Sequence, residues 1–267
     1  MRDQLELLTT ESPDVLIVLD ACRADAFRGV CSARAETVRS PARRTDRWLH
    51  QLGPLLRRRR AVYFTANPLV KSCTGRWREI TRVDVWETHW GRFSELQLPS
   101  VHPLVVNGVV GAWRDLGKLA DRTVVVHYLQ PHSPFVGAVP YALTYLRWGC
   151  AGCRMTQELC KVSVWPNTAE IDWELLRRAY RANLELVWDA ARMLADSFAA
   201  AGRRVVITSD HGELLGETKD GAPDGEPCFG HQPEYTNPLL HEVPWLVWEH
   251  APKQPTTTDK LEALGYV

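Results

Sequence analysis

Short apolar runs rich in β-branched residues recur along the chain and are separated by longer polar or amphipathic segments. Runs that are apolar throughout are typical of strands buried on both faces of a sheet. Such runs predict strands at 14–19, 61–66, 123–129, 205–207 and 244–248, with a weaker candidate at 83–86.

The segments between these runs predict helices. Residues 170–200 give the clearest pattern, with apolar positions at a spacing of about 3.6 residues and Gly202 just beyond the end. Residues 1–13, 22–30, 45–60 and 101–117 also favour helix. Strands that alternate with helices predict an α/β fold with a doubly wound, largely parallel sheet flanked by helices.

Polar residues follow two of the predicted strands directly. The strand 14–19 ends at Asp20, and the strand 205–207 is followed by Thr-Ser and then Asp210, His211 and Gly212. Ligands of open α/β sheets bind outside the carboxyl ends of the strands. Carboxylate and imidazole groups there can bind one cation, and Gly212 allows a sharp backbone turn.

Length favours one globular domain over residues 1–267, and the balanced charge gives no electrostatic reason to expect a nucleic-acid or anionic-membrane partner. The 267 residues are 45% hydrophobic and 24% charged, which is ordinary for a globular protein. Lys plus Arg and Asp plus Glu number 32 each, so no net charge favours nucleic acid or an anionic membrane surface.

The chain shows no pattern of a membrane span or a secretion signal. No run approaches the roughly 20 apolar residues that a membrane helix needs. Acidic Glu6, Glu11 and Asp14 precede the first strand in place of a basic region. Seven cysteines, an odd number, fit a reducing compartment. We therefore expect a cytoplasmic protein.

Residues 138–168 differ in character from the rest and are interpreted as an insertion or lid rich in aromatic residues and cysteine. Cys150 and Cys153 have the C-x₂-C spacing of a zinc site, which Cys160 or Cys228 would complete. Ordinary buried thiols are the favoured interpretation, because no second pair of ligands with zinc spacing is present.

Together, Val-Leu-Ile-Val-Leu-Asp20-Ala-Cys-Arg-Ala-Asp and Val-Val-Ile-Thr-Ser-Asp210-His-Gly-Glu resemble the two ends of the alkaline phosphatase superfamily, in its sulfatase-like branch. Gly230-His231, Glu242-Val-Pro-Trp, His127-Tyr-Leu-Gln-Pro-His132-Ser-Pro-Phe and the tail at 261–266 support the resemblance. It extends from about Asp14 to the C-terminus.

The resemblance implies a metal held by Asp20, Asp210 and His211 and a nucleophile that is also a metal ligand. Thr45 is the candidate nucleophile, because Ser-Pro-Ala-Arg-Arg-Thr45-Asp-Arg-Trp-Leu resembles the threonine segment of non-sulfatase members such as lipoteichoic acid synthases. Ser40 is the alternative nucleophile. Thr45 is also well placed to be a helix N-cap and nothing more.

The formylglycine route of classical sulfatases is disfavoured. It needs a Cys or Ser in a C-x-P-x-R or C-x-A-x-R context, and Cys31-Ser-Ala-Arg34 places the Arg one position too early. Ala21 replaces the usual second acid, and Gln130-Pro-His132 lacks the Asp of two-metal relatives. One divalent ion is therefore expected, with Mn²⁺ or Mg²⁺ favoured and Zn²⁺ possible.

His132 and His231 are the candidates to hold the phosphoryl oxygens or to protonate the leaving group. Glu213 is expected to cap a following helix, and Arg23 and Asp25 to tie a turn together. The expected activity is metal-dependent hydrolysis or transfer of a phosphate ester through a phosphothreonine. The substrate would be a small-molecule or a glycan- or lipid-linked phosphate ester. The alternatives are a sulfate-ester hydrolase that does not use formylglycine and an inactive, metal-binding member.

Overall fold

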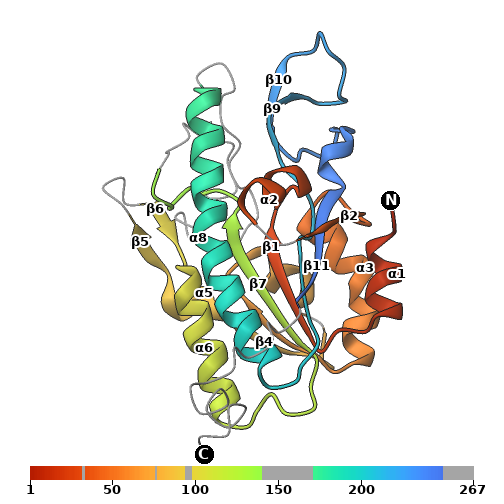
Figure 1. Ribbon diagram of the computed structural model, residues 1–267, viewed down its shortest axis with the longest axis vertical. Coiled ribbons are helices and arrows are strands. Elements are labelled where there is room, and N and C mark those ends of the chain that lie inside the picture. Colours follow the sequence, from red (N-terminus) through yellow and green to blue (C-terminus); the bar gives the residue numbers. More distant parts are fainter. Residues whose placement is uncertain (32–33, 76, 94–97, 140–170, 249–267) are drawn as a thin grey trace, which may run out of the picture.

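A seven-stranded sheet forms the centre of the computed structural model, which describes residues 1–31, 34–75, 77–93, 98–139 and 171–248 (Figure 1). The strand order is β2-β11-β8-β1-β7-β3-β4. The strands are β1 (Val15–Asp20), β2 (Glu36–Arg39), β3 (Val62–Thr65), β4 (Thr81–Asp84), β7 (Val124–Pro131), β8 (Val205–Thr208) and β11 (Glu242–Trp248). β11 pairs antiparallel with both neighbours, whereas the other recorded pairs in this sheet are parallel. The predicted fold class is confirmed.

Helices cover both faces of the sheet. The helices are α1 (Gln4–Thr10), α2 (Ala24–Val30), α3 (Thr45–Arg58), α4 (Leu69–Thr74), α5 (Val85–His89), α6 (Pro103–Asp115) and α8 (Trp173–Ala199), with a 3₁₀ turn η2 (Pro238–Leu240). Side chains of α2, α6 and α8 share one hydrophobic core with the sheet, and those of α1, α3 and α4 share the other. Two short hairpins complete the described fold: β5 (Gly91–Phe93) with β6 (Leu98–Ser100), and β9 (Leu214–Thr218) with β10 (Pro227–Gly230).

β1 shows why the strands are apolar throughout. Its residues are all buried, but successive side chains point to opposite faces. Ile17 and Leu19 belong to the core under α8, whereas Leu16 and Val18 belong to the core under α3. Each large aliphatic side chain buried in this way contributes about 1.5–3 kcal/mol to folding.

Some local predictions are wrong. The segment 83–86 is split, because β4 ends at Asp84 and α5 begins at Val85. β2 was not predicted, since an edge strand that pairs on one side only can keep polar, exposed residues. β9, and not a helix, follows Glu213.

α1 is attached to the sheet through the buried side chain of Gln4. Its amide nitrogen donates to the hydroxyl of Thr208 at 2.8 Å and to the carbonyl of Ser209 at 2.7 Å. Its oxygen accepts a 2.9 Å hydrogen bond from the indole of Trp48 on α3. Gln4 therefore connects α1, α3 and the end of β8, where Asp210 begins.

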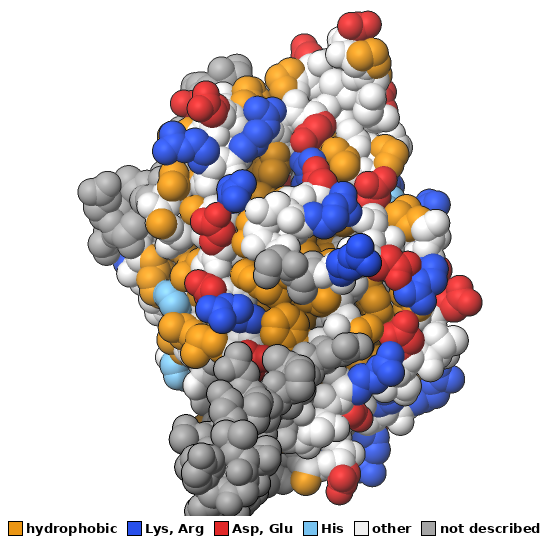
Figure 2. All heavy atoms as spheres, viewed as in Figure 1, with side chains coloured by type: hydrophobic (Ala, Val, Ile, Leu, Met, Phe, Trp, Pro, Cys, Tyr) orange, Lys and Arg blue, Asp and Glu red, His pale blue; other side chains and the backbone are white. Residues whose placement is uncertain are grey.

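The surface carries mixed charges, as the equal numbers of acidic and basic residues predict. Lys and Arg side chains are interspersed with Asp and Glu on the face shown in Figure 2. Among the described helices, none combines the length and apolar character that crossing a membrane requires. Residues 140–168 of the predicted insertion, with Cys150, Cys153 and Cys160, and the tail at 261–266 lie outside the described residues.

Candidate active site

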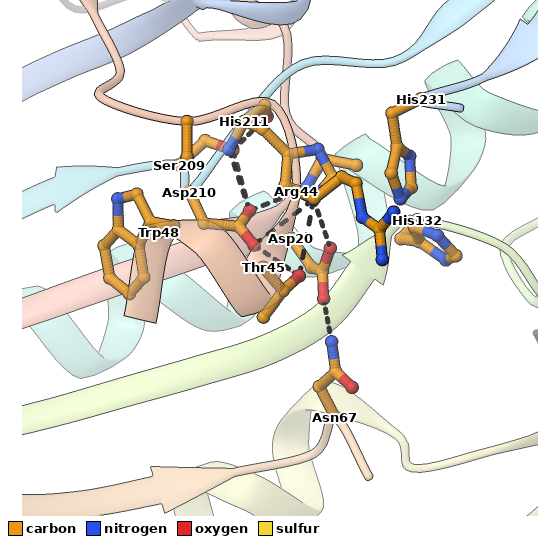
Figure 3. Close-up of polar contacts among 12 residues, drawn as sticks. Asp20, Arg44, Thr45, Trp48, Asn67, His132, Ser209, Asp210, His211 and His231 are labelled. Carbon is orange, nitrogen blue, oxygen red and sulfur yellow. Dashed lines mark hydrogen bonds and ion pairs between the residues drawn. The ribbon is translucent and has the colours of Figure 1, made fainter. Parts of the chain in front are cut away.

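Side chains from separate parts of the chain meet beyond the carboxyl ends of β1 and β8 (Figure 3). Asp20 is the last residue of β1, and Asp210 and His211 follow β8. Thr45 is the first residue of α3, and all four residues are buried. The structure thus brings together the residues that the sequence analysis proposed as ligands and nucleophile.

Asp210 is held in one orientation by hydrogen bonds to one of its oxygens. Oδ1 accepts from the backbone N–H of Ala21 at 3.1 Å and from its neighbour His211 at 3.0 Å. Oδ2 accepts from the hydroxyl of Thr45 at 2.7 Å. Oδ2 is therefore directed at the point where Thr45, His211 and Asp20 converge.

The tautomer of His211 follows from its neighbours. Nδ1 lies 2.8 Å from the carbonyl oxygen of Gly212, which can only accept, so Nδ1 carries a proton. In the neutral imidazole, Nε2 then has a free lone pair. Nε2 lies 3.3 Å from the Thr45 hydroxyl, 3.4 Å from Oδ2 of Asp210 and 3.7 Å from Oδ1 of Asp20. A lone pair directed at two carboxylates and a hydroxyl is suited to a shared cation.

His127 on β7 is a further member of this group, and the sequence analysis did not assign it a role. Its Nε2 lies 3.5 Å from Oδ2 of Asp20 and 3.8 Å from Oδ2 of Asp210, and its Nδ1 contacts the Tyr63 hydroxyl at 2.8 Å. Burial alone would lower the pKa of His127, but the adjacent carboxylates of Asp20 and Asp210 raise it above its usual value. Burial likewise opposes ionisation of Asp20, but the neighbouring histidines, His127 foremost, depress its pKa.

The donor set fits a divalent cation. Ligand atoms of Asp20, His127 and Asp210 all lie within 4.8 Å of one another. Oδ1 of Asp20 and Nε2 of His127 are buried and have no hydrogen-bond partner among the described residues. Two closely spaced carboxylates repel each other, and a cation between them would remove that repulsion and satisfy the unpartnered atoms.

A second group lies beside the first and consists of His132, Glu213 and His231. The carboxylate of Glu213 accepts a 2.8 Å hydrogen bond from Nδ1 of His231 and lies 4.0 Å from Nε2 of His132. The rings of His132 and His231 are 5.3 Å apart, and those of His231 and His211 are 4.2 Å apart. The two predicted substrate histidines therefore border the same space as His211.

The charges in this second group are coupled. Burial would raise the pKa of Glu213, but His231 and His132 lower it, so Glu213 is ionised. Burial would lower the pKa of His132, but Glu213 and Asp20 raise it. Burial and the neighbouring His211 lower the pKa of His231. One histidine thus favours the cationic form and the other the neutral form, which suits one anion-binding group and one group that exchanges a proton.

Two backbone features determine the path of the chain just after β1 and β8. Ala21 has a positive φ of 58°, which directs the chain away from β1 immediately after Asp20. Gly212 is required by close packing, since a Cβ atom there would lie 2.0 Å from the carbonyl oxygen of Leu239. The predicted reason for Gly212, a sharp turn, is thus replaced by a steric one.

The remaining predicted residues have structural contacts. The buried hydroxyl of Ser40 donates to the carbonyl oxygen of Asp210, so it supports the loop that carries the ligands. Thr45 is not the N-cap of α3, because Arg44 occupies that position. Arg23 binds Asp25 at 2.9 Å, as predicted, and also Glu217 at 2.6 Å.

Four buried side chains near the site, Tyr63, Asn67, His127 and Glu213, were not predicted to be part of it. Asn67 donates to Oδ2 of Asp20, and His127 contacts Tyr63. A signal for His127 was present in the sequence, because a polar residue interrupts the apolar run 123–129. Asn67 follows the predicted strand 61–66 just as Asp20 follows the predicted strand 14–19, so its position gave a similar signal.

No protein-family model and no curated protein matches the chain. Solved structures do match. The lipooligosaccharide phosphoethanolamine transferase A (EptA) of Neisseria meningitidis, an integral membrane protein, matches with a TM-score of 0.53 and 13% identity over 88% of this chain. The match covers 47% of EptA, so the chain spans about half of the length of that protein.

Two further structures match with lower TM-scores. The phosphonate monoester hydrolase of Agrobacterium radiobacter has a TM-score of 0.48 and 16% identity, over 89% of this chain and 68% of its own. The lipoteichoic acid synthase LtaP of Listeria monocytogenes has a TM-score of 0.45 and 10% identity, over 90% of this chain and 66% of its own. EptA is a member of the alkaline phosphatase superfamily. The chain has the sulfatase-like α/β fold of the alkaline phosphatase superfamily.

Proposed function

We propose that the protein hydrolyses or transfers a phosphate ester through a phosphothreonine formed on Thr45, with one divalent cation at the site. The observation that carries the proposal is the buried Thr45 hydroxyl, which contacts Oδ2 of Asp210 at 2.7 Å and Nε2 of His211 at 3.3 Å. A buried hydroxyl between a carboxylate and an imidazole has a base within hydrogen-bond distance, as an activated nucleophile requires.

Asp20, Asp210, His211 and Thr45 would hold the cation, and His127 is a further candidate ligand. When bound, a divalent cation lowers the pKa of a hydroxyl or water ligand and offsets charge on a phosphoryl group. The oxygen-rich donors favour Mn²⁺ or Mg²⁺, while the imidazoles keep Zn²⁺ possible. The N–H of Gly212 donates to the carbonyl of Leu240, which anchors the ligand loop to η2.

In the first step, Oγ1 of Thr45 bonds to phosphorus while the bond from phosphorus to the ester oxygen breaks. The Thr45 proton passes to Oδ2 of Asp210, which already accepts its hydrogen bond. His132, the histidine that favours its cationic form, would bind the phosphoryl oxygens. The departing alcohol takes a proton from His132 or His231, so charge and atoms balance.

In the second step, an oxygen nucleophile bonds to phosphorus while the bond from phosphorus to Oγ1 of Thr45 breaks. The nucleophile gives its proton to the histidine that protonated the alcohol, and Asp210 returns its proton to Oγ1 of Thr45. Water as the nucleophile gives hydrolysis and inorganic phosphate, whereas the hydroxyl of an acceptor molecule gives transfer. EptA is by name a phosphoethanolamine transferase acting on lipooligosaccharide. For the present protein we propose only a class of substrate, which is a small-molecule or a glycan- or lipid-linked phosphate ester.

Covalent trapping tests the proposal. The Mn²⁺-loaded protein is mixed with a panel of phosphate esters, quenched in acid and examined by peptide mass spectrometry. The expected result is one phosphate on Thr45, absent in Thr45→Ala and retained in Ser40→Ala. Phosphate on Ser40, or an aldehyde at a cysteine together with sulfate release, would refute the threonine route.

A further inference from the structure

A basic pocket lies against the first turn of α3, outside the residues assigned to the reaction. Its walls are Arg43, Arg44, Arg47, Gln232 and Pro233, and its volume is about 240 Å³. This volume is below the roughly 300–1,000 Å³ of sites that enclose a drug-sized molecule. The pocket is therefore sized for one small group and not for a whole substrate.

Two residues that line the pocket are sequence neighbours of candidate active-site residues. Arg44 directly precedes Thr45, and Gln232 directly follows His231. Consecutive Cα atoms are about 3.8 Å apart. The backbone of Arg44 therefore lies next to that of the proposed nucleophile, and the backbone of Gln232 lies next to that of a proposed substrate-binding histidine. Figure 3 shows the guanidinium of Arg44 on the side of the site where His132 and His231 lie.

Positive charge in the pocket exceeds the negative charge that contacts it. Asp46 lies 3.1 Å from Nε of Arg44 and 3.8 Å from Nε of Arg47. The guanidinium of Arg43 donates to the carbonyl oxygen of Tyr235, which fixes its position but supplies no charge. In the described part of the chain, Asp46 is the carboxylate recorded in ion pairs with Arg44 and Arg47, and no ion pair is recorded for Arg43.

The placement also argues against a purely stabilising role. The Arg47 side chain is 78% exposed, and exposed ion pairs contribute only about 0–1 kcal/mol to folding. Guanidinium groups bind phosphate with two parallel hydrogen bonds, and the amino end of a helix adds a positive partial charge. α3 has 14 residues, long enough for that contribution.

We propose that this pocket binds a second phosphate group, carried by the organic part of the substrate, while the first phosphate reacts at Thr45. The inference rests on the proposed function and narrows its substrate class to esters with two phosphate groups. Arg43 and Arg47 bind the second phosphate, and Arg44 lies between the two phosphate positions.

Matched ligands test the pocket by equilibrium binding. Isothermal titration calorimetry of the Mn²⁺-loaded full chain compares fructose 6-phosphate with fructose 1,6-bisphosphate. The parent protein is expected to bind the bisphosphate at least about tenfold more tightly, as one charge-assisted contact allows. Arg43→Gln/Arg47→Gln should lose that gain and change monophosphate affinity by less than about twofold. Arg47→Gln alone should lose part of it.

Arg58→Gln is the matched control, since Arg58 belongs to the last turn of the same helix and does not line the pocket. It should bind both sugars as the parent does. A second pair, dihexanoyl phosphatidylinositol and its 4-phosphate, shows whether the second phosphate belongs to a lipid headgroup or to a water-soluble ester. An arginine-dependent gain in either pair supports the pocket. The proposed pocket is refuted if the parent and Arg43→Gln/Arg47→Gln bind the two-phosphate ligand of each pair with equal affinity.

The outcomes separate the two proposals. Phosphate on Thr45 without an arginine-dependent gain would refute the pocket and leave the phosphothreonine route standing. An arginine-dependent gain in affinity without phosphate on Thr45 would support the pocket and refute the phosphothreonine route. Circular dichroism melting of each variant shows that the change in affinity does not arise from unfolding.

Discussion

The hydroxyl of Thr45 donates a 2.7 Å hydrogen bond to Oδ2 of Asp210, a residue 165 positions further along the chain. The contact joins the amino end of α3 to the carboxyl end of β8. The other oxygen of Asp210, Oδ1, accepts hydrogen bonds from two backbone N–H groups. Turning Oδ2 away from Thr45 would break these two hydrogen bonds. This fixed pair is the basis of the proposed reaction.

Replacing Thr45 tests the nucleophile apart from the fold. Thr45→Val keeps the shape of the side chain but removes the hydroxyl, and should abolish phosphate incorporation. Thr45→Ser should retain it, because the hydroxyl remains. The free energy of unfolding should fall by about 1–3 kcal/mol in Thr45→Val, for the lost hydrogen bond to a charged group. Activity of Thr45→Val equal to the parent's would exclude this residue as the nucleophile.

Removal of metal should destabilise the protein, because Asp20 and Asp210 face each other near His211. At a free concentration of 100 times Kd, a cation that binds only the folded state stabilises it by about 2.7 kcal/mol. Melting with and without a chelator measures this effect. Asp20→Asn should bind less metal by elemental analysis, and an unchanged metal content would place the cation elsewhere.

His132→Ala and His231→Ala should lower turnover by about 10²–10⁴-fold, the range for loss of a positioned acid or base. Metal content should stay unchanged, because neither residue belongs to the group around Asp20. The measurement pairs steady-state rates with elemental analysis. Loss of metal in either variant would instead make the group with Glu213 a second cation site.

Gln4→Ala should destabilise the protein without a direct chemical effect. The change leaves the indole of Trp48 and the carbonyl of Ser209 without their buried partner. An unsatisfied buried polar group costs about 1–3 kcal/mol, so denaturant unfolding should shift accordingly. Gln4→Glu is an informative companion, because it keeps an acceptor for Trp48 but removes the amide donor. A fully stable Gln4→Ala would show that α1 is not anchored through this side chain.

The metal-free protein should lose stability as the pH rises past neutrality. The carboxylates of Asp20 and Asp210 outweigh burial and raise the pKa of His127 above 6.5 in the folded state. A raised pKa stabilises the folded state fully below pH 6.5, and this contribution is lost as the pH rises through the folded-state pKa. Urea unfolding with chelator at several pH values, parent against His127→Gln, measures it. A difference between the two that grows with pH would contradict the prediction.

The sequence by itself determined the elements that bury apolar surface and the chemistry at their ends. The run Val15–Leu19 predicts a strand because every side chain is apolar, and such a strand needs cover on both faces. Asp20, Asp210 and His211 were found because polar residues that follow such runs lie at one edge of a parallel sheet. Thr45 was proposed as the nucleophile because its segment resembles that of non-sulfatase members of the superfamily, and not because of hydrophobic periodicity.

Only the tertiary structure decided which side chains share one site. Strand order places β7 next to β1, and this brings His127 to Asp20, a relation that no spacing along the chain expresses. Glu213 faces His231 because β9 and β10 form a hairpin, whereas local sequence favoured a helix cap. The pattern of hydrophobic residues along the sequence indicates which face of each segment is buried. Contacts between polar groups far apart in the chain depend on packing, which local sequence does not encode.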